Sequence, residues 1–251
     1  MLAALADISI WQLALVAAVA LCTSVLGGVA GYGTGALMPL VLVPIVGPEP
    51  TVPIIAISGL LTNSSRAAAY LQSIDWRRMW LVLAGAVVPC IFTAYGYTLL
   101  TGKGAMIVIG TMLMLTVALR HLLKLRAVAL GDRGLVVGGV GYGAAVGGTV
   151  GAGVILLSIL MAAGLQGAAV IATDAVISIA IGIVRLVVFG SAGVITAQVI
   201  ALALLIGIVA FPGAFLARAL VARMPLHVHT AILDAVVLIG GAVMIYGAFQ
   251  R

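Results

Sequence analysis

Two arginines lie inside long apolar stretches of the chain, and each has an aromatic residue four positions later. Arg66 is followed by Tyr70, and Arg185, 119 residues further along, is followed by Phe189. A guanidinium group is a planar fork of donors that suits carboxylate, sulfonate or phosphate oxygens, and it keeps its charge when partly dehydrated. The arginines therefore indicate an anion site in an aqueous cavity. The alternatives are snorkelling to a membrane surface and a hydrogen bond to a carbonyl of a neighbouring helix.

Polar residues at helical spacing accompany both arginines, so each set is expected on one face of a helix. The sets are Asn63, Arg66 and Tyr70 at i, i+3 and i+7, and Asp174, Ser178 and Arg185 at i, i+4 and i+11. We expect Asn63, Arg66, Tyr70, Ser178 and Arg185 to contact the anion. Asp174 is also the acid best placed for proton coupling, with an ion pair or hydrogen bond near the start of its helix as the alternative.

The composition excludes a water-soluble globule. Of the 251 residues, 65% are hydrophobic and 7% are charged, whereas a soluble domain has about 25% charged and 45–50% apolar residues. A spanning helix needs about 20 mostly apolar residues, and the chain offers such stretches from end to end. The sequence predicts an all-α, polytopic helical membrane protein of the cell (inner) membrane, with one integral membrane domain overall.

Polar breaks divide the chain into ten apolar segments. They cover residues 9–30, 35–46, 52–71, 79–100, 105–120, 134–150, 153–163, 167–189, 193–217 and 231–249. The second and seventh are short, since twelve helical residues rise about 18 Å against a hydrocarbon core of about 30 Å. Short, glycine-interrupted segments at matching places in two halves are typical of discontinuous helices in transporters.

A glycine cluster precedes each short segment, and the two clusters share the spacing G-x-x-G-x-G. The members are Gly28, Gly31 and Gly33 in the first and Gly148, Gly151 and Gly153 in the second, 120 residues later. This offset is within one residue of that of the two Arg–aromatic pairs. It predicts a duplicated unit of five segments, with repeats at residues 1–127 and 128–251. Because five is odd, the repeats would be inverted relative to each other in the membrane.

Each short helix would begin just after its glycines, with unpaired amides pointing into the protein near mid-membrane. A helix N-terminus carries roughly half a positive charge and free N–H donors, which suits an anion. Close helix packing is the alternative role for the glycines. Gly143, Gly147 and Gly151 have the i+4 spacing that such packing requires.

The basic residues favour a topology in which all ten segments cross and both termini are extracytoplasmic. Eight basic residues then lie in the cytoplasm, as the positive-inside rule requires. They are Arg77, Arg78, Arg120, Lys124, Arg126, Arg133, Arg218 and Arg223. Only Lys103 and Arg251 lie outside. A topology in which segments two and seven dip in and return scores slightly worse.

No cofactor or metal site is expected. Cys22 and Cys90 both lie in apolar runs and give neither a disulfide framework nor a metal-ligand spacing. The net charge of +6 is attributed to loop arginines that fix orientation rather than to a nucleic-acid partner. The expected partners are a small anionic substrate and membrane lipid, and a homodimer is left open.

Three short motifs occur in order: "GYGTG" (31–35) followed by Pro39 in "ALMPLVLV", "IDW" (74–76) before the next segment, and a second glycine cluster in the other half. With these motifs the chain resembles the TauE/SafE sulfite-exporter family of membrane transporters. The resemblance implies duplicated helical halves that move sulfite, sulfonates or related small organic anions, usually outward. The substrate-proximal breaks that it implies contain Gly31, Gly33, Thr34, Gly35 and Pro39 in the first unit and Gly151 and Gly153 in the second.

The expected function is that of a secondary transporter, not an enzyme, that exports a small oxoanion such as sulfite or an organosulfonate. With the cell interior negative, moving one negative charge outward gains about 2.3 kcal/mol per 100 mV, so export needs no coupling ion. An anion channel and a transporter of a carboxylate or another sulfur-containing anion stay open as alternatives. An intramembrane hydrolase is disfavoured, because H-E-x-x-H is absent and His121, His227 and His229 fall in predicted loops.

Overall fold

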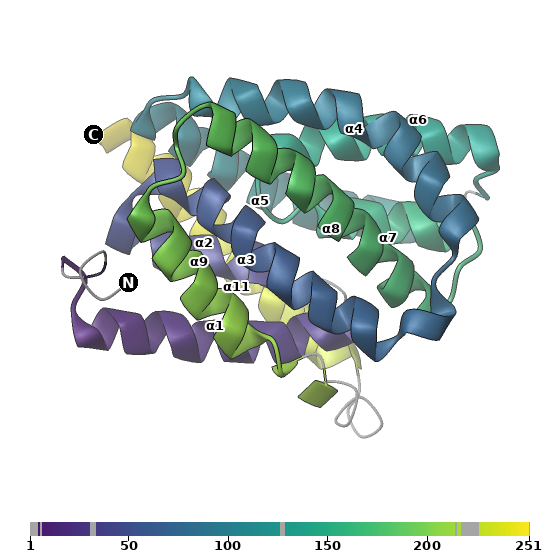
Figure 1. Cartoon of the computed structure of the whole chain (residues 1–251), viewed down its shortest axis with the longest axis horizontal. Helices are drawn as coiled ribbons and strands as arrows, with labels where there is room; N and C mark the ends of the chain where they lie inside the picture. Colours follow the sequence, from purple (N-terminus) through teal and green to yellow (C-terminus); the bar gives the residue numbers. More distant parts are fainter. Residues whose placement is uncertain are drawn as a thin grey trace.

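The computed structural model describes residues 5, 7–30, 34–125, 129–213, 215–216 and 226–250. This part of the chain is helical and contains no strand (Figure 1). The helices are α1 (Ile10–Ala30), α2 (Thr34–Val46), α3 (Pro48–Ala69), the short η2 (Leu71–Ser73), α4 (Trp76–Thr98), α5 (Gly102–Leu125), α6 (Asp132–Gly147), α7 (Gly153–Ala162), α8 (Ala168–Ser191), α9 (Ala197–Ala210) and α11 (Leu226–Gln250). The ten α-helices match the ten predicted apolar segments.

The ends of three helices differ from the prediction by five residues or more. Helix α5 continues to Leu125 and α11 begins at Leu226, so the three histidines lie within helices rather than in loops. Helix α9 ends at Ala210, seven residues early, because Pro212 follows and has no N–H for a helical hydrogen bond. The carbonyls left open there accept hydrogen bonds from other helices: Ser24 Oγ donates to Ala210 O at 2.6 Å, and Ser65 Oγ donates to Phe211 O.

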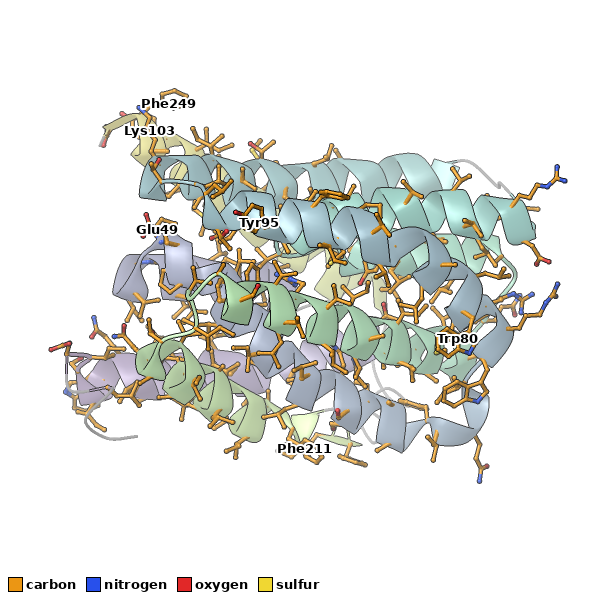
Figure 2. The ribbon with its side chains drawn as sticks, turned by 45° about the horizontal axis from the view of Figure 1, so that its top comes forward. Glu49, Trp80, Tyr95, Lys103, Phe211 and Phe249 are labelled. Atoms are coloured by element: carbon orange, nitrogen blue, oxygen red, sulfur yellow. The ribbon has the colours of Figure 1, made fainter. Side chains whose placement is uncertain are left out.

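The outer surface of the described part is rich in apolar side chains. Trp80, Tyr95 and Phe211 all point outward from the ribbon (Figure 2) and are exposed. Two described helices, α4 and α8, are long and apolar enough to cross a membrane unaided, and the remaining apolar helices have shorter apolar stretches of 10–17 residues. An apolar exterior around a packed interior suits lipid as the surrounding solvent.

The two short helices run in opposite directions along the molecule. Helix α2 ends beside the end of α4, since Tyr97 Oη donates at 2.6 Å to the carbonyl oxygen of Pro48, the first residue of α3. This end of the molecule carries Glu49 and Lys103 (Figure 2). Helix α7 ends beside the start of α6, because Leu130 N donates to Ala162 O at 2.8 Å. That is the opposite end, which carries Trp80. Both short helices therefore begin in the interior and end at opposite faces.

Helices α4 and α6 lie side by side along one edge of the molecule (Figure 1). Gly139, Gly143 and Gly147 of α6 face α4 so closely that a Cβ at each would overlap a carbonyl oxygen of α4. On the α4 side, a Cβ on Gly85 would overlap the carbonyl of Val136. Small residues permit such backbone contact between helices in a membrane. Glycines at i+4 spacing thus serve helix packing, but the packed set is Gly139, Gly143 and Gly147. Gly151 is not part of it, because it lies in the break between α6 and α7.

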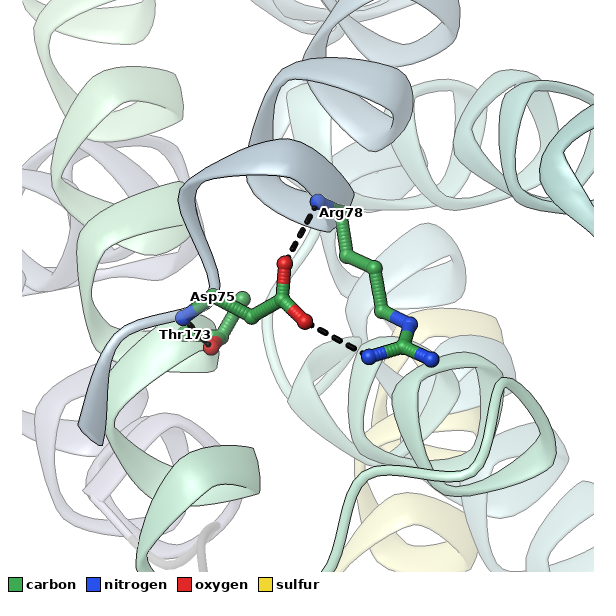
Figure 3. Close-up of polar contacts among 3 residues, drawn as sticks. All are labelled: Asp75, Arg78 and Thr173. Atoms are coloured by element: carbon green, nitrogen blue, oxygen red, sulfur yellow. Dashed lines mark hydrogen bonds and ion pairs between the residues drawn. The ribbon is translucent and has the colours of Figure 1, made fainter.

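Asp75, in the "IDW" motif, caps the start of α4 (Figure 3). Its Oδ1 accepts a hydrogen bond from Arg78 N at 2.9 Å, and its Oδ2 accepts one from Arg78 Nη1 at 2.6 Å. The N–H of Asp75 donates to Thr173 Oγ1 at 3.0 Å, which ties this turn to α8. Burial alone would raise the pKa of the Asp75 carboxyl, but the hydrogen bonds and charge of Arg78 outweigh it and lower the pKa.

Replacing Gly143 with Ala should destabilise the protein by about 1–3 kcal/mol, because the new methyl group must push α4 and α6 apart. The matched control is Gly141→Ala, on the same helix, where a Cβ meets nothing within 4 Å. Unfolding in detergent, followed by circular dichroism, measures both. Equal midpoints for the two variants would contradict the close packing of this interface.

Replacing Asp75 with Ala should lower the free energy of unfolding by about 1 kcal/mol, because the first turn of α4 loses its cap. Asp75→Asn keeps the capping oxygen and should retain part of that stability. Since the pKa of Asp75 is lowered in the folded state, its charge stabilises the protein above the ordinary value of 3.8 and loses this effect as pH falls below it. The same unfolding assay at neutral and acidic pH checks both points; a pH-independent difference between wild type and the Asn variant would count against them.

Candidate functional site

A cavity of about 140 Å³ lies where the two short helices begin, bounded by α1, α2, α3, α6, α7 and α8. Backbone atoms of Gly35, Gly151 and Gly153 contribute to its wall. Its polar lining residues are Ser24, Ser58, Thr62, Asn63, Arg66, Tyr142, Thr149, Asp174, Ser178 and Arg185. The cavity thus gathers both arginines from distant parts of the sequence into one space of a size that suits a small solute.

Arg66 projects from α3 into the cavity and pairs with α8. Its Nη2 lies 3.0 Å from Asp174 Oδ2 and also donates a hydrogen bond to Asn63 Oδ1, one turn earlier on α3. The Arg66 side chain is 14% exposed and that of Asp174 is 1% exposed. Asp174 Oδ1 is buried and has no hydrogen-bond partner among the described residues. The charge of Arg66 is therefore largely balanced by a neighbouring carboxylate.

Arg185 projects from α8 and is 6% exposed. Its Nη2 donates to the carbonyl oxygen of Thr149 at 3.1 Å, and its Cζ lies 5.7 Å from the centre of the Phe189 ring. Its Nε is buried without a hydrogen-bond partner in the described part of the chain, and no described carboxylate forms an ion pair with it. A buried charge held only by a carbonyl and a ring is costly unless a counter-ion joins it.

The break between α6 and α7 places backbone groups in the same cavity. Helix α6 ends at Gly147 and α7 begins at Gly153. Gly151, between them, has φ +84°, a left-handed conformation that side chains rarely adopt. A Cβ on Gly35 would lie 3.4 Å from Gly151 N, so the starts of α2 and α7 meet. The two helix N-termini thus present their positive ends to one space.

Most of the predicted binding residues within the described range line this cavity. They are Gly35, Asn63, Arg66, Gly151, Gly153, Ser178 and Arg185. Asp174, the candidate for proton coupling, lines it too. Pro39 is instead buried further along α2, and Tyr70 ends α3; neither is among the lining residues. Gly31 and Gly33 lie outside the described residues, and only the backbone of Thr34 is described, at the start of α2.

The structure bears differently on each of the alternative roles considered for Arg66, Arg185 and Asp174. Snorkelling is wrong for the geometry observed, because Arg66 and Arg185 both line an interior cavity instead of reaching outward. Arg185 does donate to a backbone carbonyl, but this carbonyl belongs to Thr149, in the break between α6 and α7, and not to a neighbouring helix. The ion pair proposed for Asp174 is present too, with Arg66 as its partner.

The sequence did not single out Tyr142 and Thr149. Tyr142 on α6 is 1% exposed, and its ring lines the cavity together with Val146 and Thr149. Their i, i+4, i+7 spacing was an available signal, but it was hidden among the packing glycines of the same helix. Among the described residues, no three His, Cys, Asp or Glu side chains come together as metal ligands do.

Comparison with known proteins identifies the family. Searches of curated proteins and of solved structures found no match. A scan against protein-family models matches residues 16–244 to the family described as Sulfite exporter TauE/SafE. Because this match covers almost the whole chain and agrees with the motifs and the all-helical, apolar structure, the protein belongs to the sulfite exporter TauE/SafE family of membrane transporters.

Proposed function

We propose that this protein is a secondary transporter that exports a small oxoanion, with sulfite or an organosulfonate as its substrate. The observation that carries the proposal is Arg185, a buried cation in a cavity with no carboxylate partner among the described residues. An oxoanion beside it would supply the missing counter-charge and accept hydrogen bonds from the guanidinium group. Family membership supports the substrate class.

The remaining walls of the cavity suit the same ligand. Ser178, Asn63 and Thr62 offer neutral polar groups, and the starts of α2 and α7 offer backbone amides. A sulfonate or sulfite group has three oxygens, so it can accept hydrogen bonds from several donors around the cavity at once. The modest volume of about 140 Å³ favours a small anion over a bulky one.

The proposal includes two inverted repeats, residues 1–127 and 128–251. Two observations support it. In the proposed repeats, α1, α3 and α4 of the first half correspond to α6, α8 and α9 of the second. The contact of α4 with α6 then corresponds to that of α9 with α1, and the contact of α4 with α8 to that of α9 with α3. The two short helices also run in opposite directions from a common point. Binding sites near the midplane of inverted repeats are common in transporters.

We further propose that the protein lies in the inner membrane and that the end of the molecule that carries Trp80 faces the cytoplasm. The described basic residues Arg77, Arg78 and Arg133 lie at that end, and Lys103 lies at the other, as the positive-inside rule favours. The start of α1 and the end of α11 lie at the same end of the molecule (Figure 1), which agrees with both termini being extracytoplasmic. The membrane potential would then drive an anion outward.

Asp174 gives the site a route to proton coupling. A proton on its carboxyl would remove the negative charge that holds Arg66 and would leave that guanidinium available to the anion. The unpaired Oδ1 atom provides a position for the proton. Transport could thereby respond to pH through the number of cations that face the substrate.

Neutralising Arg185 should cut oxoanion flux by roughly tenfold or more, because the substrate loses a charge-assisted hydrogen bond. Arg185→Gln and Arg66→Gln are assayed for uptake of labelled sulfite and organosulfonates in reconstituted vesicles, with the exposed Arg133→Gln as the matched control. Saturation and counter-flow in the wild type distinguish a transporter from a channel. Normal flux in both glutamine variants would refute the assignment of this cavity.

Replacing Asp174 with Asn should make flux insensitive to pH, because the carboxyl that takes up the proton is gone. The assay compares initial rates for the wild type and Asp174→Asn across pH 5.5 to about 8.5, a range within which a buried carboxyl can titrate. Asp132→Asn, the same change at an exposed acid paired with Arg77, is the control and should keep the wild-type profile. An unchanged pH profile in Asp174→Asn would remove Asp174 from the coupling.

A further inference from the structure

The two arginines of the cavity have unequal surroundings, although they occupy corresponding positions in the two halves. Arg66 contacts both Asn63 and Asp174. Arg185 contacts a backbone carbonyl and a ring, and its Nε lacks a partner among the described residues. The second guanidinium therefore keeps its charge uncompensated, whereas the first does not.

The sequence explains this inequality. At the offset of 119 residues that relates Arg66 to Arg185, Asn63 corresponds to Gly182 and Asp174 corresponds to Ile55. Both Gly182 and Ile55 line the same cavity. Neither has a side chain that can accept a hydrogen bond, so the partners of Arg66 have no equivalent at Arg185.

The formal charge of the cavity follows from these residues. Among the described lining residues, the ionisable side chains are Arg66, Arg185, Asp174 and Tyr142. Cys90 and Tyr97 are the other ionisable groups close to Arg185, and they carry no charge in their ordinary protonated forms. While Asp174 is ionised, two guanidinium groups and one carboxylate leave a single net positive charge. The helix N-termini add partial charges, whose effect is much weaker than that of a full cation.

We propose that, while Asp174 is ionised, the cavity is a site for a monoanion, and that the Asp174 carboxylate is the group that selects against dianions. This inference rests on the proposed function and narrows its substrate class to singly charged oxoanions, such as hydrogensulfite or an organosulfonate. A monoanion leaves the occupied cavity neutral. A dianion leaves one buried negative charge without a partner, which a low-dielectric interior penalises strongly.

The test measures the binding of two probes whose charge is fixed near neutral pH, methanesulfonate as the monoanion and sulfate as the dianion. Equilibrium dialysis with labelled probes on the purified full-length protein gives the ratio of their dissociation constants. Wild type should prefer methanesulfonate. Asp174→Asn raises the net charge of the cavity by one and should shift the ratio toward sulfate by roughly tenfold or more.

Two further variants provide the controls. Asp132→Asn makes the same chemical change at an exposed acid and should keep the wild-type ratio. Asn63→Asp, a nearly isosteric change next to Arg66, lowers the net charge by one and should weaken the binding of both probes, with sulfate the more affected. Because this variant changes the net charge in the opposite direction, it tests the same dependence on charge if Asp174→Asn fails to fold.

The outcomes separate this inference from the proposed function. A wild type that binds methanesulfonate, with the same ratio in Asp174→Asn and in Asp132→Asn, overturns the role of Asp174 and leaves the oxoanion transporter standing. Equal weakening of both probes in Asn63→Asp would likewise overturn the dependence on charge count. A wild type that binds neither these probes nor sulfite overturns the proposed function and the inference together.

Discussion

A cation buried away from water requires a compensating charge, and the structure around the cavity is organised by that requirement at Arg185. The side chain is fixed by the carbonyl of Thr149 and the ring of Phe189. The Thr149 carbonyl is available because α6 has already ended at Gly147, so no helical N–H takes it. The position of the Arg185 guanidinium group thus depends on the break between α6 and α7, because a continuous helix would use the Thr149 carbonyl for its own hydrogen bond.

Arg66, unlike Arg185, has a compensating charge among the described residues of the protein. There a carboxylate from the facing helix and an amide one turn away supply the acceptors, and the pair links α3 to α8 at the centre of the molecule. Breaking such a buried pair by removing one partner leaves the other charge uncompensated. The two arginines therefore differ in how readily each can turn to a ligand, even though one guanidinium stands in each half.

Much of this fold could be predicted from the sequence, because apolar runs and polar breaks determine where helices cross a lipid phase. The errors have local causes. Basic residues and histidines were taken as loop signals, yet α5 continues past His121 and α11 already includes His227, since charged side chains at a membrane surface are compatible with a helix. Pro212 ended α9 earlier than its apolar run suggests. The predicted faces of α3 and α8 were correct except for Tyr70, which follows the end of α3 and does not line the cavity. Spacing alone cannot tell which face of one helix meets which face of another. The ion pair of Arg66 with Asp174 and the wall formed by Tyr142 and Thr149 depend on that docking.

The glycine contact between α4 and α6 has a mechanical consequence. Where backbones touch with no side chain between them, axial sliding by even part of a turn would drive Cβ atoms of one helix into carbonyls of the other. These two helices come from opposite halves of the chain. Their close backbone contact therefore holds the two halves together along one edge of the molecule. In the proposed transporter, an opening that admits a solute to the cavity would keep α4 and α6 together, and the displacement would fall on other helices.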